Sequence, residues 1–399
     1  MLTLKLGPCT DDIEGSRVIR AVLRHALCKK VFMLIDTTLR EGDQRYGLYL
    51  SLEQKKVIVD GLHRLGLDEL ETGSVGRDEE LETLIKYARQ HHGSTKISLW
   101  SPCRIQELEY ADSLDPDIIS AALPVSDLHI EKRLGLDRCG ALRLLERTLA
   151  GTDKLKAKLS LGLEDFSRAD REFALRAALM ARDLGVWRVR LSDTLGVMEP
   201  GELMEAVRPF REKLDISLAF HGHNDFGMAT ANALTALSCG VDYVDVSLLG
   251  IGERAGIARL EEVLTFLVYN KGHAGYDVQS LPELSTCVAG LAGVHINPDR
   301  AVLGRQLFHC ESGLHADALY KSFDLFEPFE PHKMGMQRRI SLGRKSGAGA
   351  VRGKLMEMGV NPDFVDLEGL VRDVRRAASI KGSPLDDEQV VSMLQGQAG

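Results

Sequence analysis

Two short segments of the chain contain side chains that could together hold a metal ion. Residues 35–44 (IDTTLREGDQ) begin as an apolar strand and lead to the carboxylate of Glu41, and residues 219–225 (AFHGHND) end a second apolar strand with His221 and His223. Residues two apart on a strand project to the same side, so the two imidazoles form half of a site for Zn²⁺, Mn²⁺ or Fe²⁺. Glu41 can supply an oxygen ligand and leave positions open for a chelating substrate or water. The pattern predicts one divalent metal site, whereas a lone histidine is more often a hydrogen-bonded core residue.

Arg40 precedes Glu41 at the same strand end. A rigid guanidinium there suits the binding of a carboxylate or carbonyl group, and an exposed ion pair with Glu41 is the alternative. Other polar side chains also follow expected strands: Gln44, Glu71, Arg104, Ser126, Glu164, Asp165, Asp193, Thr194, Asn224, Asp225, Glu253 and Arg254. Polar groups gathered at the carboxyl ends of strands indicate an active site at one mouth of a barrel.

The alternation of strands and helices must position these groups. One helix is predicted where Ser51 and Gln54 form a capping box ahead of the apolar stripe of Ile58, Leu62 and Leu65. Apolar runs predict eight strands, at residues 31–37, 67–73, 96–100, 117–123, 156–163, 187–193, 215–223 and 243–249. This order predicts an α/β protein with a (β/α)8 TIM barrel. An open doubly wound sheet is the rival, but it usually carries a glycine-rich phosphate turn where this chain has TTLREGDQ.

The pattern also predicts how the chain is divided. Residues 1–30 are expected to be an N-terminal extension, and residues 31–295 the barrel domain. Beyond about residue 275 the strand–helix rhythm stops, and prolines and glycines interrupt residues 300–345. We expect residues 296–399 to form a linker and a mostly helical subdomain, which could lie over the barrel of a second subunit.

The composition excludes several classes of function. The 399 residues carry a net charge of −8, and their charges are dispersed without a basic stripe for nucleic acid or anionic membrane. No apolar run approaches the length of a transmembrane helix, and no signal peptide is evident. The seven cysteines are scattered without a CxxC pair, which fits reduced thiols and a cytoplasmic protein.

The motifs together resemble those of a known family. DTTLREG, HGHND, GIGERAG and, towards the C-terminus, GLHADAL are similar to motifs of metal-dependent enzymes that perform a Claisen condensation of acetyl-CoA. These are the isopropylmalate, citramalate and homocitrate synthases and the Re-type citrate synthase. The likeness covers residues 33–350. LPVSDLHIEKRL, LEDFSRAD and DTLGVMEP most resemble homocitrate synthases of nitrogen-fixing bacteria.

The resemblance implies roles for residues at matching positions. Glu41, His221 and His223 would hold a divalent ion (Mn, Mg or Zn), which a 2-oxo acid chelates. Arg40 would polarise the keto group of that acid. Glu253 and His315 would take part in removing a methyl proton from acetyl-CoA. Gln44, Glu71 and Thr194 would line the substrate pocket. A homodimer is expected, with acetyl-CoA and 2-oxoglutarate as substrates.

Four positions depart from the family pattern. Ile257 replaces the asparagine of GERAGN, and Phe326 stands where the family has a tyrosine. Cys310 replaces a histidine, and Ser160 replaces the arginine that lysine-pathway homocitrate synthases use for the distal carboxylate of 2-oxoglutarate. These changes leave the predicted metal site intact, but they bear on proton transfer and on the identity of the oxo acid.

Several alternatives therefore stay open. Oxaloacetate, pyruvate or 2-oxoisovalerate could replace 2-oxoglutarate. A carbon–carbon lyase similar to hydroxymethylglutaryl-CoA lyase is a second class, although the glycine-rich loop and catalytic cysteine of that enzyme are not evident. A catalytically silent binding relative is a third, motivated by Phe326 and Ile257. The intact Arg40, Glu41 and histidine pair favour an enzyme.

Overall fold

A computed structural model describes residues 32–76 and 80–397 of the chain. The predicted N-terminal extension, residues 1–30, lies outside the described residues. Within the described part, no helix has the length and apolarity that crossing a bilayer requires.

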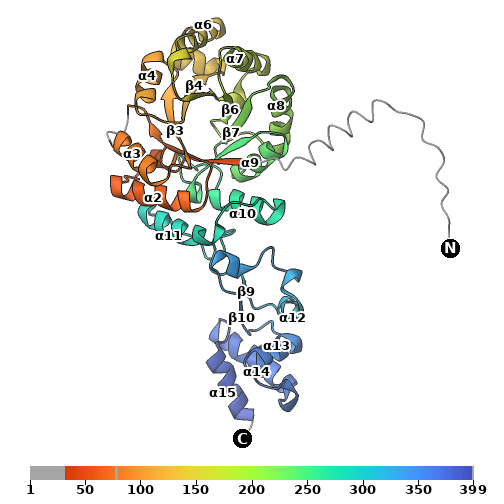
Figure 1. Ribbon diagram of the computed structural model, residues 1–399. Coiled ribbons are helices and arrows are strands. Elements are labelled where there is room, and N and C mark those ends of the chain that lie inside the picture. The colour runs from red at the N-terminus through yellow and green to blue at the C-terminus, as the bar shows by residue number, and fades with distance from the viewer. Residues whose placement is uncertain (1–31, 77–79, 398–399) are drawn as a thin grey trace, which may run out of the picture.

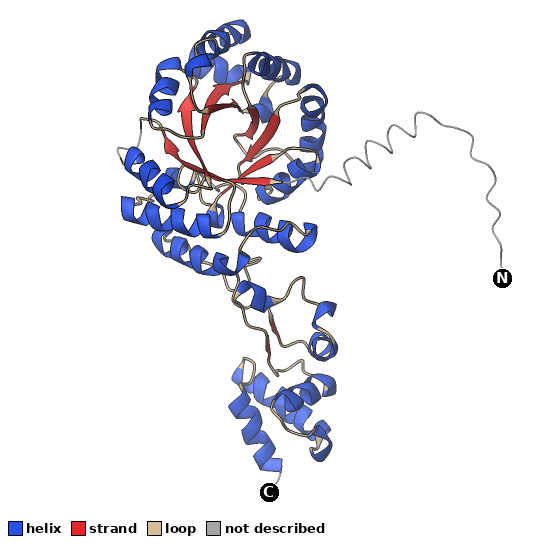
Figure 2. Cartoon of the chain, in the orientation of Figure 1, coloured by secondary structure: helices blue, strands red, loops and turns tan. Residues whose placement is uncertain are grey.

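Eight parallel strands close into a barrel in which each strand pairs with the next along the chain and β8 returns to β1. Figures 1 and 2 show the strands as an inner ring surrounded by helices. The strands are β1 (Met33–Asp36), β2 (Glu69–Ser74), β3 (Lys96–Pro102), β4 (Ile118–Pro124), β5 (Lys158–Glu164), β6 (Arg188–Asp193), β7 (Ser217–Gly222) and β8 (Tyr243–Val246). The prediction of a TIM barrel is confirmed, and all eight predicted strands are present.

The α-helices between and after the strands cover the barrel. They are α2 (Leu52–Arg64), α3 (Leu81–His91), α4 (Ile105–Ser113), α5 (Asp127–His129), α6 (Arg138–Leu149), α7 (Arg171–Asp183), α8 (Pro200–Lys213), α9 (Ala229–Ser238), α10 (Leu260–Lys271) and α11 (Leu281–Ala292). The predicted capping box is present, because the Ser51 side chain accepts from the Gln54 N–H and the Gln54 side chain accepts from the Ser51 N–H. Ile58, Leu62 and Leu65 are fully buried against the barrel. The apolar stripe therefore packs as its spacing predicts.

The C-terminal part of the chain has a hydrophobic core of its own. Leu342, Val351, Leu355, Leu370 and Val374 are buried in a cluster separate from that of the barrel. This region is helical, as predicted: α12 (Gly313–Lys321), α13 (Ala348–Glu357), α14 (Leu367–Lys381) and α15 (Asp387–Gln397). The sequence did not predict its two short parallel strands, β9 (His309–Cys310) and β10 (Arg339–Ile340). Figure 1 shows this region extending away from the barrel, beyond α10 and α11.

Ion pairs occupy part of the barrel interior, where branched apolar side chains are the usual filling. At the start of the strands, the guanidinium of Arg188 donates to both carboxylate oxygens of Glu69, at 2.7 and 2.9 Å, and to the Ser160 hydroxyl at 3.1 Å. Two residues further along the same strands, Arg190 donates to Glu71 at 3.0 Å. Because side chains two apart share a face, β2 and β6 direct both pairs into the barrel.

We expect Arg188→Met to destabilise the barrel by about 3–5 kcal/mol, because it leaves the carboxylate of Glu69 buried without a counter-charge. The double variant Arg188→Met/Glu69→Met should recover much of this loss, since it removes both charges. Urea unfolding followed by circular dichroism measures both effects. Arg208→Met, at an exposed position of α8, is the control. A loss for Arg188→Met no larger than that of the control would contradict the assignment.

Candidate metal centre and active site

The turn after β1 places Arg40 and Glu41 at the mouth of the barrel. Asp36 fixes this turn by accepting from the backbone N–H of Thr38 at 2.8 Å and from its hydroxyl at 3.0 Å. The N–H groups of Arg40 and Glu41 both donate to the Thr37 carbonyl. Complete burial raises the pKa of Asp36 to about 7. The DTTLRE sequence therefore forms a tight, internally bonded turn whose last two side chains are buried.

Three potential metal ligands converge at this mouth. One ligand atom from each of Glu41, His221 and His223 lies within 4.8 Å of the other two, and all three residues are buried. The Nε2 atoms of the histidines are 3.2 Å apart, and the Nε2 of His223 lies 3.9 Å from Oε1 of Glu41. On the other side of its ring, His221 contacts Asp245 through Nδ1, at 2.9 Å. A carboxylate on the far nitrogen fixes the ring orientation and tautomer of a metal-binding histidine.

The electrostatics of the cluster suit a cation. Burial is the main cause that lowers the pKa of His223, to about 3, so this imidazole is neutral at physiological pH and free to act as a ligand. Burial alone would raise the pKa of Glu41, but Arg40 and then the two histidines outweigh it and bring the pKa to about 2. Two nitrogens and an ionised oxygen that point at one spot fit a divalent ion such as Zn²⁺ or Mn²⁺.

Arg40 is part of a buried ion-pair network. Its Nη1 donates to Glu41 and its Nε donates to Glu71, each at 2.5 Å. Glu71 also accepts from Arg190, whose guanidinium lies 3.3 Å from the carboxylate of Asp245. Although burial opposes ionisation, Arg190 and Arg40 together hold the pKa of Glu71 well below its usual range. The alternative of an exposed Arg40–Glu41 pair is therefore wrong, because only 7% of the Arg40 side chain is exposed.

A cavity of about 330 Å³ opens over the three candidate ligands. Of the predicted substrate-pocket residues, Gln44 and Thr194 line it, whereas Glu71 is buried and binds two arginines. The predicted catalytic residues Arg40 and Glu253 also line it. The sequence reading did not single out several residues that also line it: Trp100, Ser120, Arg133, Arg190 and Ser192. The alternation of side chains along β4 and β6 could have predicted that Ser120, Arg190 and Ser192 line the cavity, because residues two apart on a strand share a face.

Arg133 reaches the cavity from an irregular helical turn. It lies in a single π-helical turn, η2 (Ile130–Leu134), that follows β4 and α5. Its Nη1 donates to Glu164, the last residue of β5, at 2.5 Å. Both side chains line the cavity, and about half of the Arg133 side chain is exposed. π-Helical turns often occur at functional sites, but no sequence period predicts them.

Several other strand-end residues build the rim. Asp165 has a φ of +58°, accepts from the hydroxyl of Ser126 at 2.5 Å and donates its N–H to Thr194 at 2.8 Å. Asp193 accepts from the N–H groups of Val197 and Met198. Arg104 is exposed at the start of α4 and does not line the cavity. These contacts order the loops around the site.

The GIGERAG segment closes the rim after β8. Gly256 has a φ of +79°, and a Cβ there would come within 1.7 Å of the Gly250 carbonyl, so only glycine fits. Ile257, which replaces the family's asparagine, is buried and pairs with the backbone of His223. The segment also supplies Arg254, whose guanidinium donates to Asp225 at 2.9 Å.

The described residues that line the cavity do not include His315. This exposed histidine lies on α12, where its ring is 4.3 Å from that of Phe326. Figure 1 places α12 in the C-terminal region, away from the barrel strands. Within one chain, the structure therefore keeps His315 apart from the other predicted site residues.

Comparisons with known proteins identify families, relatives and a solved structure that this chain resembles. Residues 31–288 match the family described as HMGL-like, and residues 302–382 match the homocitrate synthase post-HMGL domain-like family. The chain is 33% identical to 2-isopropylmalate synthase 2 of Caldanaerobacter subterraneus subsp. tengcongensis over 92% of this chain and 96% of that one. It is also 33% identical to homocitrate synthase 1 of Nostoc sp., over 92% and 97%. The fold is similar to that of hydroxymethylglutaryl-CoA lyase from Pseudomonas aeruginosa, with a TM-score of 0.60, 20% identity and coverage of 67% of this chain and 94% of that one.

We expect His223→Ala to lose divalent-metal binding while the barrel stays folded, because it removes one of three converging ligands at the mouth. Titration with Mn²⁺ followed by electron paramagnetic resonance measures the affinity, and circular dichroism reports the fold. His309→Ala removes a histidine from the C-terminal region and is the matched control. Unchanged Mn²⁺ affinity in His223→Ala would show that this histidine is not a ligand.

Proposed function

The chain belongs to the family of isopropylmalate and homocitrate synthases, enzymes that condense an acyl-CoA with a 2-oxo acid, and we propose that it joins acetyl-CoA to 2-oxoglutarate as a homocitrate synthase. The buried cluster of Glu41, His221 and His223 beneath a cavity carries this proposal. It matches what a chelating 2-oxo acid requires, namely an ion with open positions in a site large enough for a small ligand.

The three ligands and Arg40 would prepare the oxo acid for attack. Glu41, His221 and His223 would hold the ion, which when bound supplies Lewis-acid polarisation of the keto group. Arg40 lines the same cavity and would stabilise negative charge that develops on the keto oxygen. Because Glu41 and Glu71 hold its guanidinium from two sides, Arg40 keeps its orientation without substrate.

The condensation also needs a base. A methyl proton leaves acetyl-CoA for that base, the resulting enolate forms a bond to the keto carbon, and the alkoxide takes up a proton. Water then cleaves the thioester and releases the thiol of coenzyme A. Besides the proposed metal ligand Glu41, two carboxylates line the cavity as candidates. Glu253 is 52% exposed and lies 3.7 Å from Arg254, whereas Glu164 already accepts from Arg133 at 2.5 Å. Because Arg133 occupies Glu164, we propose Glu253 as the base.

We place His315 at the same step through a second subunit. In one chain His315 is remote from the cavity, and α12 and the following turn expose large apolar side chains, among them Leu314, Leu325 and Phe326. Exposed apolar patches are typical of protein interfaces. A homodimer in which each C-terminal region covers the partner's barrel would bury this patch and bring His315 to a cavity.

Arg133 supports a dicarboxylic oxo acid. The position at which lysine-pathway homocitrate synthases carry an arginine is Ser160, whose hydroxyl binds the buried Arg188 at the opposite end of the barrel. Arg133 brings a guanidinium into the cavity from another element. Bidentate binding of a carboxylate is the recognition that arginine favours, so Arg133 would take the distal carboxylate of 2-oxoglutarate.

Other substrates and functions remain in competition with this proposal. Isopropylmalate, citramalate and Re-type citrate synthases use the same site chemistry on 2-oxoisovalerate, pyruvate and oxaloacetate. The likeness to a hydroxymethylglutaryl-CoA lyase shows the fold and carries no argument for lyase activity. A catalytically silent relative would have little reason to keep two histidines and a carboxylate buried with their ligand atoms within 4.8 Å of one another.

We expect thiol release from acetyl-CoA to be fastest with 2-oxoglutarate and to require Mn²⁺ or Mg²⁺. A thiol-reactive dye measures the rate with 2-oxoglutarate, oxaloacetate, pyruvate and 2-oxoisovalerate. Arg133→Gln should raise the KM for 2-oxoglutarate by about tenfold or more, since it removes a charged hydrogen-bond donor, and should leave pyruvate unaffected. Arg104→Gln, outside the cavity, is the control. No turnover with any acid would refute the synthase function, and faster turnover of a monocarboxylic acid would refute the choice of 2-oxoglutarate.

We expect two inactive variants to restore activity when mixed. His223→Ala removes a barrel ligand, and His315→Ala removes the C-terminal histidine. If His315 serves the partner's barrel, a mixed dimer contains one complete site, so unfolding and refolding the variants together should recover about one quarter of wild-type activity. Separately refolded variants are the control. Recovery no greater than in the control would show that His315 acts within its own chain or not at all.

A further inference from the structure

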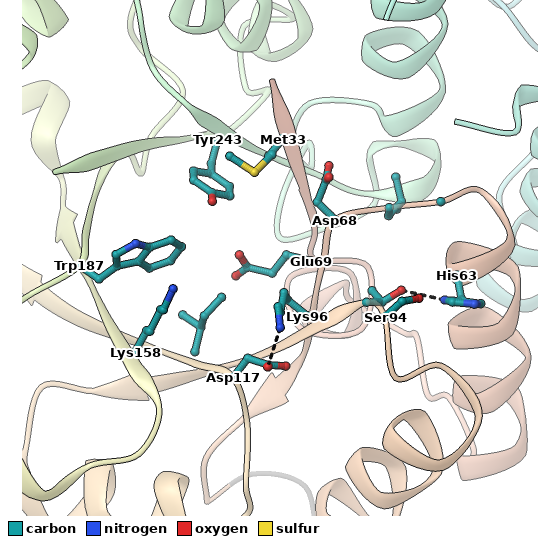
Figure 3. Close-up of a pocket in the computed structure, with 14 residues that line it drawn as sticks. Met33, His63, Asp68, Glu69, Ser94, Lys96, Asp117, Lys158, Trp187 and Tyr243 are labelled. Carbon is teal, nitrogen blue, oxygen red and sulfur yellow. Dashed lines mark hydrogen bonds and ion pairs between the residues drawn. The ribbon is translucent and has the colours of Figure 1, made fainter. Parts of the chain in front are cut away.

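A second cavity lies at the opposite mouth of the barrel, where the strands begin. Its volume is about 460 Å³, and it shares no lining residue with the catalytic cavity. The first residues of six strands contribute to it: Met33, Glu69, Lys96, Ile118, Lys158 and Tyr243. Figure 3 shows Met33, Glu69, Lys96, Lys158 and Tyr243 around the cavity, together with Trp187. We call it the basal cavity.

Aromatic rings that are fixed in place form one wall of the basal cavity. The rings of Trp187 and Tyr243 meet edge to face with centroids 5.7 Å apart. The guanidinium of Arg188 lies 5.0 Å from the first ring and 4.7 Å from the second. Because Arg188 is itself held by both oxygens of Glu69, the wall is rigid before any ligand arrives. A preorganised aromatic surface favours the binding of a flat or branched apolar group.

The carboxylates of the basal cavity are already engaged by the protein. Glu69 binds Arg188 through both oxygens, and Asp117 accepts from Lys96 and from the Ile97 N–H. Asp68 accepts from the Leu34 N–H at 3.0 Å and from the Tyr276 hydroxyl at 2.7 Å. Because these carboxylate oxygens already accept hydrogen bonds or face a cation, a cationic ligand would find few free acceptors in the basal cavity.

Three donors around the aromatic wall, by contrast, make no hydrogen bond or ion pair to any other described residue. They are the ammonium of Lys158, the hydroxyl of Tyr243 and the indole N–H of Trp187. The ammonium lies 4.8 Å from the centroid of the Trp187 ring, so the charge and the ring face the same space. Burial raises the pKa of Tyr243 to about 12, which keeps its hydroxyl a donor at neutral pH. In Figure 3, Lys158, Trp187 and Tyr243 lie on the same side of the cavity.

We propose that the basal cavity is a binding site for a small organic carboxylate with an aromatic or branched apolar body. The carboxylate would accept from Lys158 and from the neighbouring donors, and the apolar body would lie against Trp187, Tyr243 and Met33. The site is separate from the catalytic one and does not depend on the proposed condensation.

The two tryptophans of the chain make this proposal testable, because Trp100 lines the catalytic cavity and Trp187 the basal one. In a Trp100→Phe background, Trp187 is the single indole reporter. We expect 3-phenylpropionate to change its fluorescence saturably. Propionate, which lacks the ring, and 2-phenylethylamine, which carries the opposite charge, should bind at least about tenfold more weakly.

Matched charge reversals then assign the binding to the basal cavity. Lys158→Glu should weaken 3-phenylpropionate binding at least about tenfold, whereas Lys156→Glu, two residues earlier and outside the cavity, should leave it unchanged. Both positions are exposed, so both variants should fold as the parent does. Absence of a saturable signal, equal binding by the amine, or full displacement by 2-oxoglutarate with Mn²⁺ would each overturn the proposal.

Discussion

The pairing of buried charges inside the barrel is the constraint on which the site depends. An isolated ion in a protein interior is costly, so each of these arginines and carboxylates must face a partner. Glu71 binds Arg40 and Arg190 together, and Arg190 in turn approaches Asp245. Asp245 orients His221. The side chain proposed to polarise the substrate and one proposed metal ligand are therefore positioned by the same connected set of ion pairs.

This arrangement also explains why the chemistry lies at one mouth of the barrel. On both β2 and β6 the charged residues are two positions apart. The ion pair between Glu69 and Arg188 lies where the strands begin, and the ion pair between Glu71 and Arg190 lies nearer the catalytic end. The pair Glu69–Arg188 lies at the basal cavity, where Glu69 lines the cavity and Arg188 packs against the aromatic wall. The pair Glu71–Arg190 borders the catalytic cavity instead. Two ion pairs of the same kind, one from each level of the strands, thus border two different cavities.

Much of the fold and part of the site could be predicted from the sequence. Apolar runs of strand length and the polar groups behind them identified all eight strands, and spacing by two placed His221 beside His223. Glu71 binds Arg40 and Arg190 and is not among the residues that line the cavity, and sequence alone cannot distinguish a strand-end carboxylate that faces a ligand from one that faces a buried arginine. The place of Arg133 could not be predicted, because it lies on a π-helical turn, which has no periodic sequence pattern. The separation of His315 from the cavity depends on how the C-terminal region is held, and local sequence patterns contain no such information.

The ion-pair network has a further consequence for electroneutrality. Within this network Glu41, Glu71 and Asp245 carry three formal negative charges and Arg40 and Arg190 carry two positive ones, so the network alone leaves one negative charge in excess. A dication at the three converging ligands would reverse that excess, and the carboxylate of a chelating oxo acid would then cancel it. An oxo acid that entered first would meet a surplus of its own charge in a poorly solvated space. The charge balance of the network therefore favours entry of the cation before the anion.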